Sequence, residues 1–301
     1  MSVLFTDSDC ELWYDELEKL NVKNIDMPFT IDGIEYMYDL GKTTDFEDFY
    51  SKLRKGKNGT TSALNTENYK EIFEPIFAAG EDILYISFSH AMSGTFNQLR
   101  IAVRELKEKY PERKFTMFNT NCISTPSAIH VKEAARLKAE GKSDEDIVKH
   151  LKDFTSQVCC YMMVDSLMHL KRGGRLSATA AVAGSILSIK PLLTFDENGS
   201  LKVFNKVIGR KAAINFLTNK IINEAVDDEK YEAYVMDADC RAETEAMLKN
   251  IKEKRPNLKI KLQTIGPVVG CHCGPGLIAV AFVAKERPIA INDIDKAVEV
   301  F

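Results

Sequence analysis

Short apolar segments alternate with amphipathic segments along the first half of the chain. Residues 3–6, 83–89 and 115–120 are apolar and rich in β-branched or aromatic residues, which predicts buried strands. Apolar residues at helical spacing predict helices over 95–110 and 126–141, after two of these strands. Strands that alternate with helices predict a mostly parallel, doubly wound α/β sheet. Such sheets bind ligands in the loops at the carboxyl ends of their strands.

The pattern changes in the second half. A turn sequence at 196–199 separates two β-rich runs, which predicts a hairpin over 191–208. A helix is expected over 177–189, and two longer amphipathic helices lie among further apolar strands. This half therefore predicts a smaller mixed sheet with helices on it. We expect two α/β domains, the first at 1–160 and the second at 161–301.

Two further segments have a distinctive composition. Residues 265–284 form the most apolar window, but they contain two prolines, four glycines and a histidine. This composition favours strand, turn and buried strand over a membrane helix. Residues 40–60 are the most polar stretch and predict a loop, in which the basic run 52–57 is solvated. We expect no stable insertion into a membrane.

Composition narrows the function classes. A chain of 301 residues is long enough for two domains. Its net charge is −4 and its basic residues are dispersed, so it lacks the positive surface that nucleic acid requires. The N-terminus has no basic segment of the kind that begins a signal peptide. Seven cysteines without an export signal favour reduced thiols in a cytoplasm.

The segment 88–96, FSHAMSGTF, is the first candidate binding site. A β-rich run ends there, and Ser93, Gly94 and Thr95 lead into a predicted helix. Helix N-termini present unpaired N–H groups that bind anions such as carboxylates. Ser93 adds a hydroxyl, and Gly94 permits close approach of a ligand to the backbone. The alternative is that Ser93 serves only as a helix N-cap.

The segment 58–64, NGTTSAL, is the second candidate. It carries a glycine and three consecutive hydroxyl side chains before a helix predicted at 66–78. It resembles a phosphate-binding loop but lacks the Lys-Ser or Lys-Thr pair that such loops require after the second glycine. The alternative is an ordinary turn that caps the helix.

The segment 266–276, GPVVGCHCGPG, is the third candidate. Zinc sites use about four ligands, and paired cysteines are typically two or more residues apart, whereas Cys271 and Cys273 are separated by one. On a strand these thiols share one face and His272 points to the other, so His272 is badly placed as a base for Cys273. The remaining alternatives are a core histidine or one that faces a ligand pocket, and the flanking glycines favour the pocket.

Taken together, the motifs resemble the DegV family of fatty-acid-binding proteins. The resemblance rests on short motifs in family order over about 3–284, and no cofactor other than the bound lipid is implied. These motifs are Thr6-Asp7-Ser8, Thr61-Ser62, Ser93-Gly94-Thr95, Asp165-Ser166-Leu167, Gly173-Gly174-Arg175, IKPLLTFDENG (189–199) with Arg210 after it, and GPVVGCHCGPG.

The resemblance implies a long-chain fatty acid held between two domains. It implies that Thr61, Ser93 and His272 contact the carboxylate, and that a separate ATP-dependent kinase converts this carboxylate to an acyl phosphate. Arg210 is a candidate for contact with the kinase or the phosphoryl group. Four further residues are supporting candidates: Ser62, Gly94, Thr95 and Arg175. Apolar side chains of 180–189 and Met162-Met163 are suited to line the tail tunnel.

Departures from the family pattern and two rival functions accompany this hypothesis. Ala63-Leu64-Asn65 replaces Gln-Pro-Ser after Thr61-Ser62, and His90 lies in a serine-glycine-rich position.

The first rival is a serine hydrolase with Ser93 as nucleophile, although Ala91 and Thr95 stand where a nucleophile elbow has glycines. The second is a redox or metal protein that uses Cys271 and Cys273. The family reading predicts neither catalysis by this chain nor a bound metal.

Overall fold

The computed structural model describes residues 2–176, 188–226 and 229–301 and has an α/β fold with two main sheets. The first sheet has the strand order β14-β7-β6-β1-β2. All its pairings are parallel except that of β14 with β7. The strands are β1 (Ser2–Asp7), β2 (Lys23–Ile25), β6 (Asp82–Ser87), β7 (Phe115–Asn119) and β14 (Val298–Val300). The predicted mostly parallel sheet is confirmed.

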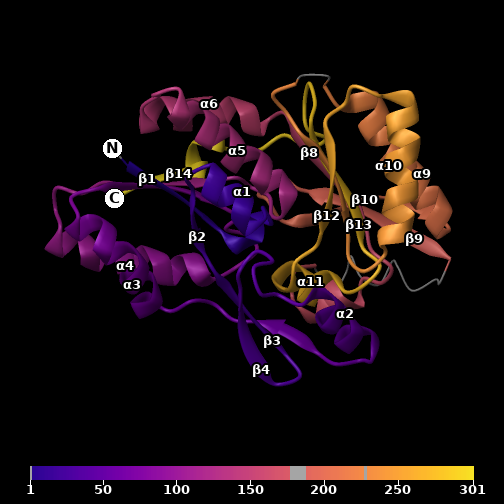
Figure 1. The fold of residues 1–301 in the computed structure, drawn as a ribbon, viewed down its shortest axis with the longest axis horizontal. Helices are drawn as coiled ribbons and strands as arrows, with labels where there is room; N and C mark the ends of the chain where they lie inside the picture. Colours follow the sequence, from indigo (N-terminus) through magenta and orange to yellow (C-terminus); the bar gives the residue numbers. More distant parts are fainter. Residues whose placement is uncertain (1, 177–187, 227–228) are drawn as a thin grey trace.

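Helices cover both faces of the first sheet, as expected for a doubly wound fold. Helices α3 (Thr66–Ala78) and α4 (Thr95–Lys109) lie on one face, and α5 (Thr125–Ala139) and α6 (Asp144–Thr155) lie on the other (Figure 1). After β1 the chain forms the short 3-10 helix η1 (Ser8–Cys10) and then α1 (Tyr14–Lys19). The C-terminal segment, with η2 (Ile294–Ala297), returns to this sheet, so both termini lie at the same end of it (Figure 1).

The second sheet is mixed and has the order β10-β9-β8-β13-β11-β12. Only β11 and β12 pair in parallel. Its six strands exceed the five of the first sheet, so it is not the smaller one. The strands are β8 (Val158–Met163), β9 (Ile189–Phe195), β10 (Leu201–Ile208), β11 (Ala233–Asp237), β12 (Ile260–Thr264) and β13 (Ile278–Val283). The predicted hairpin is formed by β9 and β10.

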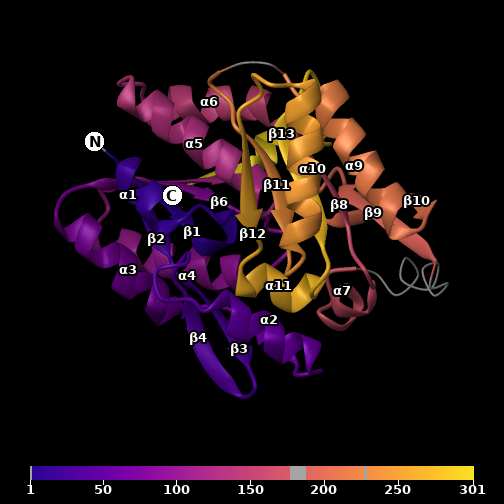
Figure 2. The same cartoon turned by 45° about the vertical axis from the view of Figure 1, so that its right-hand side comes forward.

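The two faces of the second sheet belong to different hydrophobic cores. Helices α9 (Arg210–Glu224) and α10 (Arg241–Lys254) cover the outer face, and α5 lies against the inner face (Figures 1 and 2). Along β8, Cys159 and Tyr161 join the outer core, whereas Cys160 and Met162 join the core shared with the first sheet. Strict alternation of side chains along a strand produces this division. The predicted two-domain division at residue 160 stays a prediction.

A small third sheet and a helix replace the loop predicted at 40–60. Strands β3 (Met27–Ile31), β4 (Ile34–Tyr38) and β5 (Gly59–Thr61) form the order β4-β3-β5, and α2 (Phe46–Arg54) follows β4. The loop prediction was wrong because the average polarity concealed a helical pattern. The aromatic and aliphatic residues at 46, 49, 50 and 53 share one face of α2, and three of them are buried. The basic run 52–57 therefore begins inside a helix.

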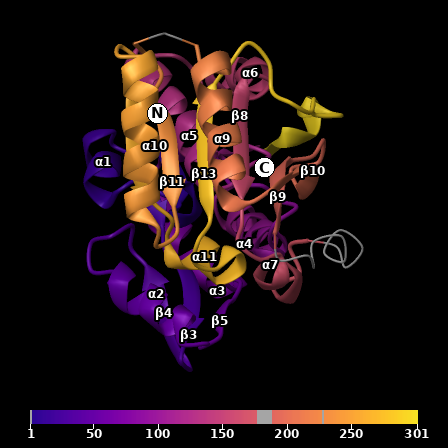
Figure 3. The same cartoon turned by 90° about the vertical axis from the view of Figure 1, so that its right-hand side faces the viewer.

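The segment 266–276 contains a helix where we predicted a strand. Helix α11 (Pro267–Cys273) lies against β5, β3 and the short helix α7 (Met168–Arg172), near α2 (Figure 3). Pro267 occupies the first turn of α11, where its missing N–H has no cost, and Gly274 follows the helix with φ 71°. The strand β13 predicted after it is confirmed. The helix predicted over 177–189 falls mainly on 177–187, outside the described residues.

Candidate functional site

A largely apolar pocket lies where loops of the first sheet meet β3, β5, α7 and α11. Its enclosed volume is about 50 Å³, within about 540 Å³ of unfilled space that includes its open mouth. Polar side chains lie on its wall at Asp9, Thr61, Ser62, Ser93, Arg175 and His272. The apolar wall comes from elements of both main sheets and the small sheet: Met27, Pro28, Phe88, Met92, Ile123, Leu170, Leu201, Val268 and Val269.

Thr61 and His272 meet directly at this pocket. The Thr61 Oγ1 atom lies 2.9 Å from His272 Nε2, and this hydrogen bond joins β5 to α11. Burial, and to a smaller extent the charge of the Arg175 guanidinium, lowers the pKa of His272 to about 4, so the imidazole is neutral at pH 7. Its Nδ1 atom is buried and has no hydrogen-bond partner among the described residues. The imidazole thus has hydrogen-bonding capacity that this chain leaves unused.

Gly173 permits the position of the His272 ring. A Cβ atom at residue 173 would lie 2.3 Å from His272 Nδ1, closer than any real contact. The glycine has an ordinary helical φ of −73°, so its role is close approach and not an unusual backbone conformation. The glycine pair before Arg175 therefore has a definite packing function, which spacing alone did not reveal.

Ser93, Gly94 and Thr95 have three different environments. Ser93 lines the pocket, and its Oγ accepts a hydrogen bond from the Thr95 backbone N–H at 3.2 Å. Gly94 is the N-cap residue of α4, and a Cβ atom there would meet nothing within 4 Å. The Thr95 side chain is fully buried and bonds to Tyr69 Oη at 2.7 Å, away from the pocket. Ser93 is therefore adjacent to the helix end but is not its N-cap.

Ser62 and Arg175 also line the pocket, each with a protein partner. Ser62 Oγ donates to Glu35 Oε2 at 3.0 Å. Arg175 Nε donates to the Met92 carbonyl at 2.9 Å, and Nη1 donates to the Gly173 carbonyl. Arg175 also lines two neighbouring cavities of about 700 Å³ and 270 Å³. The second of these is reached past Thr61 and His272, so the polar end of the pocket adjoins a further opening.

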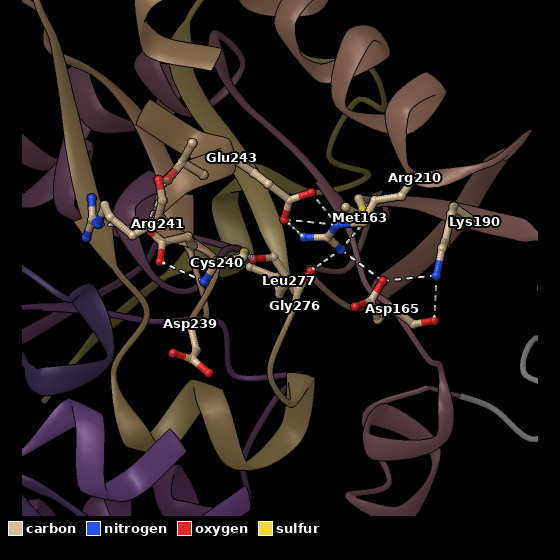
Figure 4. A network of polar contacts seen from close by, with 12 residues as sticks. Met163, Asp165, Lys190, Arg210, Asp239, Cys240, Arg241, Glu243, Gly276 and Leu277 are labelled. Carbon is tan, nitrogen blue, oxygen red and sulfur yellow. Dashed lines mark hydrogen bonds and ion pairs between the residues drawn. The ribbon is translucent and has the colours of Figure 1, made fainter. Parts of the chain in front are cut away.

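Arg210 lies in a separate polar network and not in the pocket wall (Figure 4). Its Nε and Nη2 atoms donate to the Glu243 carboxylate at 2.8 and 2.6 Å. Its Nη1 atom donates to Asp165 Oδ1 and to the Gly276 carbonyl, both at 2.8 Å. Lys190 also bonds to Asp165 at 2.9 Å. Every guanidinium nitrogen of Arg210 therefore has a partner within the second sheet and its loops.

The thiols near His272 are buried and protonated. Burial raises the pKa of Cys271 and of Cys273 to about 12. Cys271 Sγ donates to the Thr60 carbonyl at 3.6 Å. Because α11 is helical, the two thiols do not share a face as predicted for a strand. Within the described residues, no three His, Cys, Asp or Glu side chains form a metal-binding group.

The hydrolase alternative gains no support from the surroundings of Ser93. Within the described ranges, no histidine is hydrogen-bonded to Ser93, and His272 Nε2 bonds to Thr61 instead. His90, three residues earlier, bonds to Ser87 Oγ at 3.0 Å and lies against the Phe96 ring. His90 therefore faces the interior of the first half and not the pocket.

The departures from the family pattern have local structural explanations. Asn65 caps α3, since its side chain accepts from the Asn68 N–H at 2.9 Å and Asn68 returns a bond to the Asn65 N–H. This is a capping box, with asparagine at both positions. His90 accepts a hydrogen bond from Arg100 on its Nδ1 atom at 3.1 Å. Met162 and Met163, predicted to line a tunnel, belong to the two cores and not to this pocket.

An acidic cluster lies beside the pocket, and sequence reasoning singled out only its first member, Asp7, in the motif Thr6-Asp7-Ser8. Asp7, Asp9 and Glu11 are all almost fully buried. Burial raises the pKa of Asp7 to about 7 and that of Glu11 to about 8. Glu11 accepts bonds from Ser124 Oγ and, at 2.6 Å, from the N–H of Gly266, where α11 begins. The only sequence signal was three acids at alternate positions directly after a strand.

The arrangement defines a class of protein: an α/β protein of two sheets, with an apolar pocket and a polar end between them. The chain belongs to the DegV family, whose family model matches residues 2–285. A DegV domain-containing protein of Clostridium perfringens is 37% identical over 285 residues, which cover 95% of this chain and 98% of that protein. Another, from Caldanaerobacter subterraneus, is 31% identical and covers 94% of this chain and 98% of its own length.

Solved structures agree with this assignment. DegV of Bacillus subtilis, described as a fatty acid binding protein, is 26% identical, with a TM-score of 0.80 over 94% of this chain and 99% of that one. A stearic-acid-binding protein of Eubacterium ventriosum is 21% identical, with a TM-score of 0.81 over 95% of this chain and 99% of that one. The predicted fold and family are confirmed. In the part of the chain that the structure describes, no helix is suited to span a membrane.

Proposed function

We propose that this protein binds a long-chain fatty acid in the pocket and itself performs no chemistry on it. The observation that carries the proposal is the composition of the pocket wall. Nine apolar side chains line a cavity whose wall also carries Thr61, Ser93 and His272. The fatty acid binding described for the 26% identical Bacillus subtilis protein supports the same ligand class.

The carboxylate end of the ligand lies at Thr61, Ser93 and His272 in this proposal. Ser93 supplies a hydroxyl donor. The bond between Thr61 and neutral His272 uses one proton of that pair, so the pair offers the carboxylate one further donor: the Thr61 O–H if Nε2 is protonated, or the His272 Nδ1–H if Nδ1 is protonated. A carboxylate that accepts two or three directed hydrogen bonds stays ionised, which suits a nucleophile toward phosphorus. Ser62, Gly94 and Arg175 support this end, whereas Thr95 acts through its bond to Tyr69. Arg210 remains a candidate for partner contact.

The tail supplies most of the affinity. Burial of about fourteen methylenes contributes about 11 kcal/mol of gross transfer free energy, at about 0.8 kcal/mol each. Loss of chain freedom offsets a good part of it. An apolar cavity of about 150 Å³ accepts one benzene, so the enclosed volume of about 50 Å³ must widen several-fold around a long chain. The methionines on the wall, Met27 and Met92, have the flexibility for this change.

The ligand carboxylate is presented, we propose, to a separate ATP-dependent kinase that forms the acyl phosphate. Support comes from the cavity of about 270 Å³ that borders Thr61 and His272, since it gives a second molecule a route to the carboxylate end. The domains at 1–160 and 161–301 would then be the two halves that close on the chain. All seven cysteines are free thiols, which favours a cytoplasmic location.

Mass spectrometry of the purified protein before and after delipidation tests the proposal. We expect a co-purified long-chain fatty acid, its removal by delipidation, and its recovery when free fatty acid is added. Decanol and a fatty acid methyl ester serve as ligands without a carboxylate, and both should bind more weakly than the acid of equal length. Absence of any bound acyl chain together with no uptake of added fatty acid would contradict the proposal.

A further inference from the structure

The pocket wall contains one buried carboxyl group without a partner. Asp9 lines the pocket and is only 2% exposed. Its Oδ1 atom is fully buried, and no hydrogen bond reaches it from any described residue. Buried polar groups are paired in the great majority of cases, so an orphan in a ligand pocket points to a group that the ligand brings.

The groups around Asp9 favour its neutral form. Burial, and then the like charges of Asp7 and Glu11, raise the pKa of Asp9 well above its usual range. The positive charge of Arg175 acts in the opposite direction and lowers the pKa of Asp9, but by less than these three causes raise it. A neutral carboxyl group both donates and accepts hydrogen bonds. Asp9 can therefore pair with a ligand hydroxyl in either direction.

An unsubstituted acyl chain does not satisfy Asp9. The wall near it is apolar, with Met27, Phe88 and Ile123 among its members. Methylene groups laid against Asp9 offer no hydrogen bond, so the buried polar group stays unpaired. A hydroxyl group at that point of the chain supplies the hydrogen bond that Oδ1 lacks. The pocket should therefore favour an acyl chain with a hydroxyl group at that point over an unsubstituted chain.

Asp9 and Thr61 belong to segments that contact different parts of β3. Ser8, the neighbour of Asp9 in η1, accepts a hydrogen bond from the Met27 N–H at 2.9 Å. Thr61 pairs with Phe29, two residues further along the same strand. The two segments therefore approach the pocket at different positions along β3.

We propose that Asp9 selects fatty acids that carry a hydroxyl group along the chain, beyond the carbons next to the carboxylate. This inference rests on the proposed fatty acid binding and narrows its ligand class. The hydroxyl group pairs with the Asp9 carboxyl group while the carboxylate stays at Thr61, Ser93 and His272. Asp9 is thus a specificity-determining residue and takes no part in any reaction.

Competition binding to the delipidated wild-type protein provides the first test. Stearate, 2-hydroxystearate, 10-hydroxystearate and 12-hydroxystearate compete with a fluorescent fatty acid. We expect the 10- or the 12-hydroxy acid to bind at least tenfold more tightly than stearate, and 2-hydroxystearate to match stearate. Equal affinities for all four, or a preference for 2-hydroxystearate alone, would overturn the inference. If none of the four binds, the proposed fatty acid binding itself fails.

Two variants test whether Asp9 causes the preference for a hydroxylated chain. Asp9→Leu removes the polar group, so it should bind stearate more tightly than wild type and lose the hydroxyl preference. Asp9→Asn keeps hydrogen-bonding capacity at nearly the same size and should keep part of the preference. A loss of stearate affinity in Asp9→Leu, at an unchanged melting temperature, would make Asp9 a partner of the carboxylate and overturn the inference. If Asp9→Leu does not fold, Asp9→Asn and the wild-type competition still decide it.

Discussion

Two polar clusters in this molecule differ in how completely they are paired. Around Arg210, every guanidinium nitrogen donates to Glu243, Asp165 or a backbone carbonyl. At the pocket, His272 Nδ1 and Asp9 Oδ1 are buried and have no partner in the described part of the chain. The fully paired cluster around Arg210 holds segments around the second sheet together. The incompletely paired cluster at the pocket can still form hydrogen bonds to a ligand.

The completeness of hydrogen-bond pairing therefore distinguishes a cluster that stabilises the fold from one that can bind a ligand. Unpaired buried groups destabilise a fold by about 1–3 kcal/mol each, so a ligand that pairs with those in a pocket wall gains binding free energy. The family resemblance placed Arg210 and His272 in one functional set, but the structure puts them in different surroundings. Substitutions in the two clusters should therefore change different measured quantities.

The largest effect is expected from Arg210→Ala on stability. The variant loses two ion pairs and the bond to the Gly276 carbonyl, and it leaves Glu243 without this cation, whereas Asp165 keeps Lys190. We expect the free energy of unfolding in urea to fall by about 1–2 kcal/mol. The neighbouring exposed Lys211→Ala should change it by less than about 0.5 kcal/mol. Undiminished stability together with impaired acyl phosphate formation would instead assign Arg210 to partner contact.

The next largest effect is expected when acyl phosphate formation by the proposed kinase is measured with the variants His272→Ala and Ser93→Ala. Each variant loses a hydrogen bond to the charged end of the ligand, so acyl phosphate formation should fall about ten- to hundredfold. Fatty acid affinity should fall less than about threefold, because the tail dominates binding. Val269→Ala, in the apolar wall, should show the reverse pattern. Equal loss of binding and turnover in the polar variants would contradict an orienting role.

A smaller effect is expected from Gly173→Ala. The new methyl group would lie 2.3 Å from His272 Nδ1, so the ring must shift away from residue 173, which disturbs its bond to Thr61. Acyl phosphate formation should fall about tenfold, and kinetic assays at saturating fatty acid measure it. In a His272→Ala background the same substitution should have no further effect, because the ring is already absent. Additive losses in the double variant would show that Gly173 acts through another contact.

The smallest effect concerns pH and stability. The pKa of Glu11 is about 8 in the folded protein, above its ordinary 4.5, so its contribution is complete below pH 4.5 and is lost as pH rises through 8. The pKa of His130 is lowered to about 4 by burial, so its contribution is present above pH 6.5 and is lost as pH falls toward 4. The two effects oppose each other between pH 4.5 and 6.5, so stability should be greatest in that range and should fall as pH rises from 6.5 to 8.

Urea unfolding from pH 5 to 9 checks this profile. Glu11→Gln removes the titration while its amide can still pair with Ser124 and the Gly266 N–H. The variant should lose less stability than wild type between pH 6 and 9, by up to about 1.4 kcal/mol per pH unit. His130 is untouched by the substitution, so the acid side of the profile should be unchanged. Identical alkaline slopes in the two proteins would contradict the role given to Glu11.

Sequence reasoning recovered the elements whose pattern is local. Strand β6 and helix α4 lie within two residues of the predicted ranges, because apolar periodicity reports a buried face directly. It failed at α11, where Gly and Pro were interpreted as features of strand and turn. Pro267 at the first turn and Gly274 after the last are equally good signals of a short helix. The same ambiguity concealed that Val268, Val269 and His272 share one helical face.

Motif order indicated the hydroxyl and imidazole groups of the site, but not their relations. Thr61 and His272 are 211 residues apart and become bonded only when β5 packs on α11. The pKa of Asp9 and its missing partner depend on burial by segments distant in the chain. Periodicity and turn chemistry act over a few residues, so they specify strands, helices and hairpins. Pairing, desolvation and the pocket arise between segments, so only packing in three dimensions establishes them.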